Sequence, residues 1–461
     1  MDSTNTAPKL DLLLDVFGQR LVTIFTQIGF CFPTRAGCEP QDIISVLTQG
    51  TQRLAKSFPW LAGQVVCEGA TEANTGVFKI KPLDAAPRLF VKDLRDDLSI
   101  PSMDDMRQSG FPMGALDETI FAPRKTISGT PSEAIAEVFQ LQASIIRGGL
   151  VLTFLGQHQS MDGIGQAQVI SLFSKACRNE DFTEEELRIG NLAPENTVRL
   201  LDSSWNPGPE LSHNIVKKDL SQPGPGSLQS KMPTYKGAWA HFNVSASALE
   251  ALKAEATQTL PPDSSFVSTD DALSAFVWRS ISKIRLAQFT PTTKTQFSRA
   301  VDLRRYLDIP QTHPGFVQSM TYHDFTMQQL VHGPLGAIAA DLRAAVDPAT
   351  SNLAYHGRSL ATLISRTPNK KLTSFIAGFD LSKDVMLSSW ANQNSYELDF
   401  GLGLGRPEAV RRPRFADFPG LVYLLPRSAA GDIGIAMSLS ADEMDLLSAD
   451  EEFAKYATYI G

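Results

Sequence analysis

The spacing of apolar residues along the chain predicts alternating helices and strands. From Gln41 to Lys56 the apolar positions recur at helical spacing, and this helix is expected to end before Pro59. A short apolar run over residues 64–67 follows a corner rich in Pro and Gly, and another over residues 10–17 opens the chain, so both are expected to be strands. Helices and strands in this order are typical of an α/β fold, in which helices cover a mixed sheet.

Two apolar runs, over residues 138–146 and 150–155, are joined by a Gly-rich turn and predict a β-hairpin. A helical pattern follows over residues 165–175. Between the second strand and this helix stands Gly-Gln-His-Gln-Ser-Met-Asp-Gly, residues 156–163. His158 is therefore expected where a strand ends and a helix begins, a place where loops commonly hold reactive groups on a rigid frame.

The apolar periodicity disappears between Trp205 and Gly237, where prolines are interspersed with Gly and Ser. This break predicts an N-terminal lobe over residues 1–205, a crossover linker over residues 206–236 and a C-terminal lobe over residues 237–461. The C-terminal lobe is expected to open with a strand near its first residues.

Composition and charge exclude several classes of partner. Of 461 residues, 43% are hydrophobic, which is enough for extensive cores, and 50 acidic against 42 basic side chains give a formal net charge of -8. Because no dense cluster of Lys or Arg is present, neither nucleic acid nor an anionic membrane is an expected partner. No segment approaches the roughly 18 apolar residues of a membrane span, and the four cysteines lack C-x-x-C spacing. We expect a cytoplasmic protein with reduced thiols that acts as a monomer.

His158 is the candidate general base. An imidazole, whose ordinary pKa is about 6.5, can take the proton of an alcohol as its oxygen attacks an acyl group, which is typically worth roughly 10²–10⁴-fold in rate. Asp162 either orients this imidazole or forms a structural ion pair, and the turn expected at Gly163 favours the ion pair. The alternatives are a core histidine that hydrogen-bonds a strand end and, for the whole chain, a binding protein without activity. The other histidines lack metal-ligand spacing, so no metal is expected.

Two motifs carry a family resemblance. Residues 158–162 match His-x-x-x-Asp, and residues 399–403, Asp-Phe-Gly-Leu-Gly, stand where the family has Asp-Phe-Gly-Trp-Gly. With further similarity from Phe58 to Ala457, the chain resembles the BAHD acyltransferase superfamily, and within it the fungal trichothecene acetyltransferases. The resemblance implies an α/β fold of two lobes, each a mixed β-sheet flanked by helices, with the active-site channel between them.

The resemblance also implies a reaction. It indicates acetyl-CoA-dependent O-acetylation of a fungal secondary metabolite, with a trichothecene 3-hydroxyl as the expected acceptor and another terpenoid, polyketide or alkaloid alcohol as the alternative. His158 would act as general base in a ternary complex, with acetyl-CoA as co-substrate and no cofactor. A serine hydrolase is disfavoured because the chain has no G-x-S-x-G, and a condensation domain because Gln157 replaces the first of its two motif histidines.

Further site residues follow from the same resemblance. Ser388 matches a family hydroxyl that hydrogen-bonds the tetrahedral oxyanion, although a polar strand edge is the ordinary interpretation. Asp399, with its loop residues Gly401 and Gly403, is expected to be structural. Arg304 is expected to pair with a motif aspartate and fasten the lobes, with Asp162 preferred over Asp399.

Recognition of CoA calls for a few cationic side chains and free backbone groups. The candidates are Lys236, Ser268, Thr269 and Asp270. A solvated lysine and a helix cap are the alternatives for these four residues. The basic run Arg411, Arg412 and Arg414 has the same alternative of a solvated face.

Overall fold

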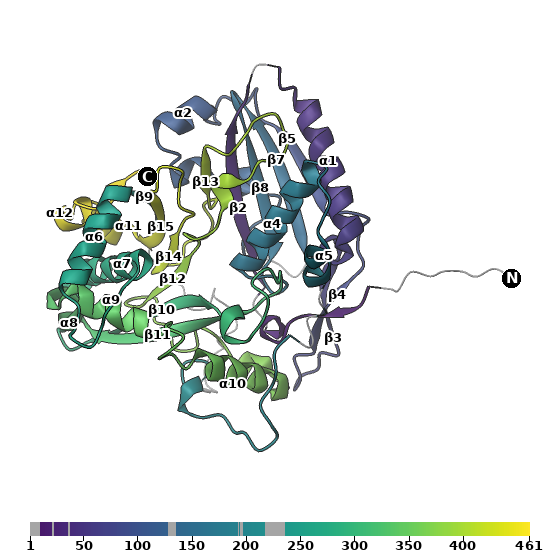
Figure 1. Ribbon diagram of the computed structural model, residues 1–461. Coiled ribbons are helices and arrows are strands. Elements are labelled where there is room, and N and C mark those ends of the chain that lie inside the picture. Colours follow the sequence, from purple (N-terminus) through teal and green to yellow (C-terminus); the bar gives the residue numbers. More distant parts are fainter. Residues whose placement is uncertain are drawn as a thin grey trace.

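The computed structural model describes residues 10–20, 23–35, 37–127, 135–191, 193, 197–216 and 236–461. Within these residues two large sheets lie side by side, one in each half of the molecule, and helices cover them (Figure 1). The first has five strands in the order β13-β2-β8-β7-β5, and the second has seven in the order β11-β10-β12-β14-β15-β9-β16. A smaller sheet has the order β1-β4-β3-β6. The predicted fold class is confirmed.

The helices and strands of the N-terminal half are β1 (Leu12–Leu13), β2 (Phe25–Pro33), α1 (Pro40–Ser57), β3 (Gln64–Glu68), β4 (Val77–Lys81), β5 (Arg88–Asp93), α2 (Met103–Gln108), α3 (Glu118–Phe121), β6 (Ala136–Glu137), β7 (Phe139–Ile146), β8 (Gly149–Gln157), α4 (Gly163–Cys177) and α5 (Glu184–Gly190). Those that follow later in the chain are β9 (Gly237–Val244), α6 (Ala246–Gln258), α7 (Thr269–Arg285), β10 (Lys294–Asp302), β11 (Gln318–Thr326), α8 (Met327–His332), α9 (Leu335–Ala344), α10 (Leu353–Arg366), β12 (Val385–Ser389), β13 (Ala409–Arg411), β14 (Leu421–Leu424), β15 (Ile433–Ser440), α11 (Ala441–Ser448), α12 (Glu451–Ala454) and β16 (Thr458–Tyr459). Short 3-10 helices include η1 (Val16–Gln19) and η8 (Arg304–Tyr306).

The elements with strong local signals form where they are predicted. Helix α1 covers the predicted 41–56, and β7 and β8 form the predicted hairpin, with Ile146 opposite Gly149 across the turn. Helix α7 begins with the side chain of Ser268 accepting from the amide of Asp271, which is a capping box.

The opening strand over residues 10–17 is shorter than predicted. Only Leu12 and Leu13 pair in the sheet, and η1 follows at once. The buried side chain of Gln19 explains the change, because its amide donates to the carbonyl of Leu14 at 3.1 Å and its oxygen accepts from the amide of Phe78 at 2.8 Å. A side chain thus replaces the backbone pairing that would have extended the strand.

The boundary at residue 237 does not separate the two halves in space. Strand β13, although late in the chain, pairs antiparallel with β2 of the N-terminal sheet. The ring of Phe400, just before it, packs against Phe30 at 5.6 Å and Phe154 at 5.5 Å between ring centroids. The prediction of one continuous C-terminal lobe over 237–461 is therefore wrong for this segment. Most of the predicted linker, residues 217–235, lies outside the described residues.

The centre of the N-terminal sheet carries the predicted reactive loop. Strand β8 is buried along its whole length between β2 and β7, with Phe25 opposite Gln157. The amide of His158 donates to the carbonyl of Ile24 at 2.9 Å, which extends this pairing by one residue. Helix α4 then begins at Gly163, so His158 sits on a loop anchored at both ends.

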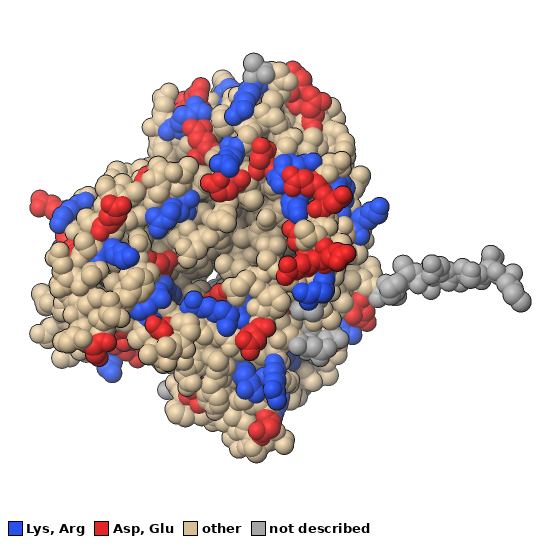
Figure 2. Space-filling model, viewed as in Figure 1, with Lys and Arg blue, Asp and Glu red and all other residues tan. Residues whose placement is uncertain are grey.

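Two further expectations concern thiols and membranes. All four cysteines are free. In the described parts of the chain, no helix has the length and apolar composition needed to cross a bilayer. Acidic and basic side chains are interspersed over the face seen in Figure 2.

Candidate active site

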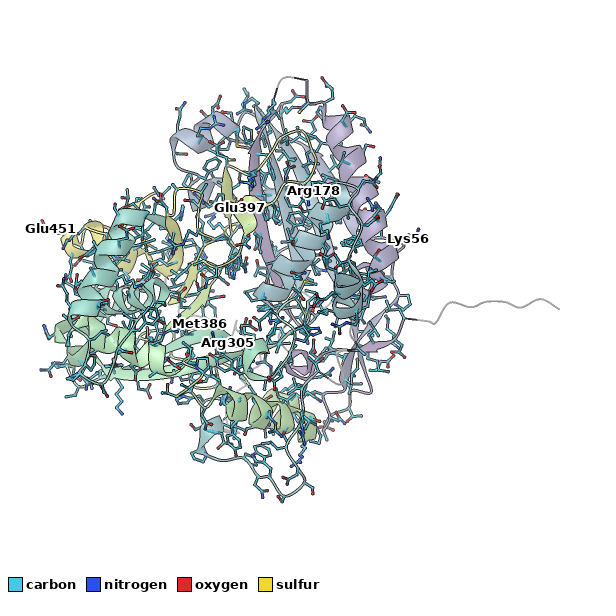
Figure 3. The ribbon with its side chains drawn as sticks, in the orientation of Figure 1. Lys56, Arg178, Arg305, Met386, Glu397 and Glu451 are labelled. Atoms are coloured by element: carbon cyan, nitrogen blue, oxygen red, sulfur yellow. The ribbon has the colours of Figure 1, made fainter. Side chains whose placement is uncertain are left out.

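A cavity lies where the two halves meet. Its wall combines residues of the N-terminal half, among them Thr26 and His158, with residues of the C-terminal half, among them Phe316, Met386 and Ser388. It holds about 1250 Å³ of empty space when counted out to its open mouth. Figure 2 shows the molecule hollowed near its middle, and Met386 is labelled beside this opening in Figure 3. There is room here for a drug-sized ligand.

The imidazole of His158 is held in one tautomer. Its Nδ1 lies 3.0 Å from the backbone oxygen of Met161, and because a carbonyl only accepts, Nδ1 carries the proton and donates it. Nε2 is left with its lone pair, and no described residue hydrogen-bonds it. The ring of Phe316 contacts the imidazole edge to face, with 5.2 Å between centroids. Since His158 lines the cavity, the free nitrogen is available to a substrate hydroxyl.

The surroundings favour the neutral imidazole. Burial lowers the pKa of His158 below its ordinary value, and the positive charges of Arg412 and Arg20 lower it further. The carbonyl of Met161 and the carboxylate of Asp162 act in the opposite direction but do not reverse the shift. His158 is therefore unprotonated at neutral pH, as a general base requires.

The carboxylate of Asp162 is occupied by structural contacts. Its carboxylate caps α4 by accepting from the amide of Gly165 at 2.8 Å, and it accepts from the amide of Val317 at 2.8 Å. Arg304 donates to both of its oxygens, at 3.0 and 3.1 Å. The carboxylate makes no hydrogen bond to the imidazole of His158, so the proposed orienting role of Asp162 in catalysis finds no support in the geometry.

The guanidinium of Arg304 is fully buried, and all of its hydrogen-bond donors have acceptors. Besides Asp162, it donates to Asp302 at 2.9 Å and to the backbone oxygens of His313 at 2.9 Å and Gly315 at 2.7 Å. All five of its N–H groups thus have acceptors. The predicted choice of Asp162 over Asp399 as partner of Arg304 is confirmed, and the pair joins the start of α4 to the loop before β11.

A close backbone contact supports the same junction. A β-carbon on Gly165 would lie 2.1 Å from the backbone oxygen of Pro314, so only glycine allows this approach. The first turn of α4 and the loop that carries Phe316 are consequently held together, and with them the two sides of the cavity around His158.

Ser388 lies on the C-terminal side of the cavity. It is the fourth residue of β12, which is held between β10 and β14, and it stands opposite Tyr423. Its side chain lines the cavity and has no hydrogen-bond partner among the described residues. The next residue, Ser389, donates instead to the carboxylate of Asp270. Ser388 is thus a free donor on a rigid strand in the same cavity as His158.

The Asp399 loop lies away from the cavity. The backbone oxygen of Asp399 accepts from Ser174 at 2.8 Å and from Arg178, while its carboxylate accepts from the amide of Gly401 at 2.8 Å. Gly401 and Gly403 have φ of 66° and 73°, which side chains strongly disfavour. Leu402 is buried in the core of the N-terminal half, where it stands in for the family tryptophan.

The four candidates for CoA binding do not line this cavity. Lys236 is exposed immediately before β9. Ser268 is engaged in the capping box and accepts from Arg343 at 3.2 Å, while Asp270 pairs with Arg299 and accepts from Ser389. The structure therefore gives internal partners to two of these side chains, and the donor-binding roles of all four, including Thr269, stay a prediction.

The basic run is not a uniformly solvated face. Arg414 is exposed and pairs with Asp117, but Arg412 is only 3% exposed and lines the cavity together with Arg20. The sequence did not predict that Arg20 and Arg412 line the cavity, because an isolated arginine gives no periodic signal. The one hint was the apolar context, since Arg412 is close to Val410 and Phe415.

No metal site accompanies these groups in the described residues, where no three His, Cys, Asp or Glu side chains converge to hold an ion. An imidazole whose Nε2 has no partner among the described residues and a serine hydroxyl face one cavity between two α/β halves. General-base chemistry on a bound hydroxyl can use this arrangement. Comparisons with known proteins show the family of the chain. A family model described as "Transferase family" matches residues 121–454, and one described as "Trichothecene 3-O-acetyltransferase-like N-terminal domain" matches residues 24–177. The chain belongs to this transferase family, the BAHD acyltransferases, and is an enzyme of the acyltransferase class.

Similar proteins cover the whole chain. The O-acetyltransferase dmxR13 of Cryptosporiopsis sp. is 48% identical over 98% of this chain and 98% of its own length. The trichothecene 3-O-acetyltransferase TRI101 of Fusarium sporotrichioides is 45% identical over 100% of this chain and 99% of its own. The crystal structure of F. graminearum TRI101 complexed with coenzyme A and deoxynivalenol superposes with a TM-score of 0.94 at 43% identity, covering 98% of this chain and 100% of that one.

Proposed function

We propose that this enzyme transfers the acetyl group of acetyl-CoA to the 3-hydroxyl of a trichothecene, with His158 as general base. The observation that carries the proposal is the free Nε2 of His158 in a cavity shared by both halves. Support for the donor and acceptor comes from relatives. TRI101 of F. sporotrichioides is named a trichothecene 3-O-acetyltransferase, and the structure of F. graminearum TRI101 was determined with coenzyme A and deoxynivalenol.

The geometry supports a direct transfer in a ternary complex. The acceptor hydroxyl gives its proton to Nε2 of His158 while its oxygen attacks the thioester carbonyl. The carbonyl oxygen becomes an oxyanion, which Ser388 stabilises by donating a hydrogen bond. The tetrahedral intermediate then collapses, the carbon–sulfur bond breaks, and the thiolate of CoA takes the proton from the imidazolium. The products are the acetyl ester and free CoA, and no acyl-enzyme forms.

An activity assay can test the proposed acceptor. Incubation with acetyl-CoA and a trichothecene that has a free 3-hydroxyl should release free thiol, and mass spectrometry should show one added acetyl group at that position. The same trichothecene already esterified at the 3-hydroxyl is the matched control and should release none. If trichothecenes stay unmodified while another terpenoid or polyketide alcohol is acetylated, the acyltransferase assignment stands and the acceptor is the alternative one.

Replacing Ser388 with Ala should lower kcat by roughly 10²–10³-fold, because one donor to the oxyanion is removed where water is excluded. The KM values for both substrates should change little, since the ground-state carbonyl needs this donor less than the oxyanion does. Ser388→Thr retains the hydroxyl and should recover most of the rate. Equal losses of rate in both variants would show that the position matters for packing alone.

The remaining expectations about cellular setting stay predictions. The enzyme is proposed to act as a monomer in the cytoplasm, with no nucleic acid or membrane as partner. Size-exclusion chromatography with light scattering measures the first of these directly.

A further inference from the structure

Two arginines are buried in the wall of the cavity. Arg20 is 7% exposed and Arg412 is 3% exposed, and both line the cavity with His158. Among the described residues, no carboxylate accepts a hydrogen bond from either guanidinium. Glu118 is near enough to influence Arg412, but its carboxylate accepts from Gln27 at 3.0 Å and from the amide of Thr126 instead.

Arg412 has aromatic faces in place of an anion. Its guanidinium carbon lies 4.2 Å from the ring centre of Phe415, 4.8 Å from that of Tyr423 and 5.9 Å from that of Trp390. Its hydrogen bonds, to the backbone oxygen of Gln27 and to Thr126, are long at 3.3 and 3.4 Å. Ring faces attract a cation but do not replace strong acceptors, so its terminal N–H groups are poorly satisfied.

Arg20 is placed similarly on another part of the wall. Its guanidinium carbon lies 3.2 Å from the ring centre of Phe375 and 5.5 Å from that of Phe316. Nε donates to the backbone oxygen of Phe17 at 2.9 Å, and no acceptor for the terminal nitrogens is found in the described residues. Burial without an anion lowers the pKa of Arg20 to about 9. Because Phe316 also touches the imidazole of His158, this cation lies close to the reacting centre.

The electrostatic character of the cavity follows from these contacts. The remaining lining is largely apolar and aromatic, and no Asp, Glu or Lys of the described chain contributes to it. A buried cation without a partner destabilises a protein, so an arginine in such a place requires a compensating role. A ligand that brings hydrogen-bond acceptors into the cavity would supply the missing partners.

We propose that Arg20 and Arg412 select the acceptor, favouring an alcohol surrounded by carbonyl, ether or hydroxyl oxygens, neutral or anionic, and rejecting an alcohol that carries a protonated amine. The inference rests on the proposed function and narrows it, because oxygen-rich terpenoids and polyketides fit this cavity and basic alkaloids do not. Each guanidinium would donate to a different part of the acceptor while His158 takes the proton of the reacting hydroxyl.

The wild-type enzyme provides the first test. Pairs of alcohols matched in size are compared with acetyl-CoA as donor, one member with a carbonyl or ether oxygen and the other with a basic nitrogen at the same position. At pH 7.5 the value of kcat/KM should be roughly 10²-fold lower for the protonated amine, because like charges meet inside a poorly hydrated cavity. Equal values within about threefold for the two members would overturn the selection.

Variants provide the second test. Arg412→Met and Arg20→Met keep an unbranched apolar side chain and remove the charge. Each should lower kcat/KM for the oxygen-rich acceptor by roughly 10-fold or more, since a charge-assisted hydrogen bond is lost. Each should also reduce the ratio of kcat/KM for the oxygen-rich acceptor to kcat/KM for the amine. The KM for acetyl-CoA should stay at the wild-type value. Arg414→Met, from the same basic run but exposed and paired with Asp117, is the matched control and should match the wild type.

The outcomes separate the two proposals. Variants that are folded by circular dichroism and retain the wild-type preference would overturn the selection by these arginines. If a variant does not fold, the wild-type acceptor pairs decide the question alone. A wild-type enzyme that acetylates no alcohol would overturn the proposed function and the selection with it, whereas one that acetylates alcohols regardless of charge overturns the selection only.

Discussion

Replacing His158 with Ala should lower kcat by roughly 10²–10⁴-fold while leaving the affinity for acetyl-CoA nearly unchanged. The methyl group of alanine cannot take the proton of the acceptor hydroxyl, whereas the imidazole makes few contacts that stabilise the fold. In the wild type, kcat/KM should be level around neutral pH and fall only below about pH 6.5, because burial lowers the pKa of His158 and the base must be neutral to act. Thiol release measures the rate, and calorimetric titration measures the binding of acetyl-CoA.

The control for this experiment is His332→Ala, which removes an exposed histidine at the end of α8 and should leave kcat unchanged. A His158→Ala enzyme that retains activity within about tenfold of the wild type would contradict the assignment of the base. The fall of kcat/KM at low pH should also disappear in His158→Ala. If the residual activity of this variant still falls over the same pH range, a group other than His158 causes the fall.

Replacing Arg304 with Met should lower the free energy of unfolding by about 3–5 kcal/mol, because the carboxylate of Asp162 would be left buried without its partner. The variant should unfold at a clearly lower urea concentration, and much of it should be insoluble when expressed at 37 °C. Because Arg304 does not line the cavity, the part of the variant that does fold should retain most of its kcat. Urea titration followed by tryptophan fluorescence measures the change.

An exposed ion pair provides the comparison for Arg304. The side chains of Arg406 and Glu397 are 64% and 55% exposed and lie 2.8 Å apart, so Arg406→Met should change the free energy of unfolding by less than about 1 kcal/mol. If Arg304→Met unfolds at the wild-type urea concentration, the buried pair does not fasten the two halves.

These two residues show how stability and catalysis are connected in this fold. Asp162 ends the loop that begins with His158, and Arg304 holds Asp162 against the loop before β11. The same loop supplies Phe316, which touches the imidazole. The ion pair therefore joins the loop that carries His158 to the loop that carries Phe316, on either side of the cavity.

The elements nearest the base could be predicted because their signals are local. A hairpin with a Gly-rich turn, an amphipathic helix and a capping side chain each depend on residues a few positions apart, and β7, β8, α4 and the start of α7 formed accordingly. The prediction of a strand over residues 10–17 was largely wrong because a long-range contact decides the structure there. The apolar run of this segment predicts a strand, but the side chain of Gln19 reaches a residue 59 positions away and ends the pairing.

The roles of charged residues were the hardest to predict. Asp162 and Arg304 were correctly paired through the family resemblance, because nothing in the sequence indicates a contact between residues 142 positions apart. The environment of Arg412 was not predicted, since Arg411, Arg412 and Arg414 are equivalent in sequence and differ only in what packs around them. Arg414 meets solvent and Asp117, whereas Arg412 meets the rings of Trp390, Phe415 and Tyr423.

The sequence by itself determined which local elements form and that His158 stands between a strand and a helix, because backbone propensities, apolar periodicity and turn residues act over short stretches of chain. Only the tertiary structure decided that β13 joins the N-terminal sheet, and that His158, Arg20 and Arg412 line one cavity. It also decided that, among the described residues, Nε2 of His158 has no hydrogen-bond partner and the two arginines have no carboxylate partner. These properties depend on burial and on contacts between residues hundreds of positions apart. The dielectric environment and partners of a charged group exist only once the halves have packed together.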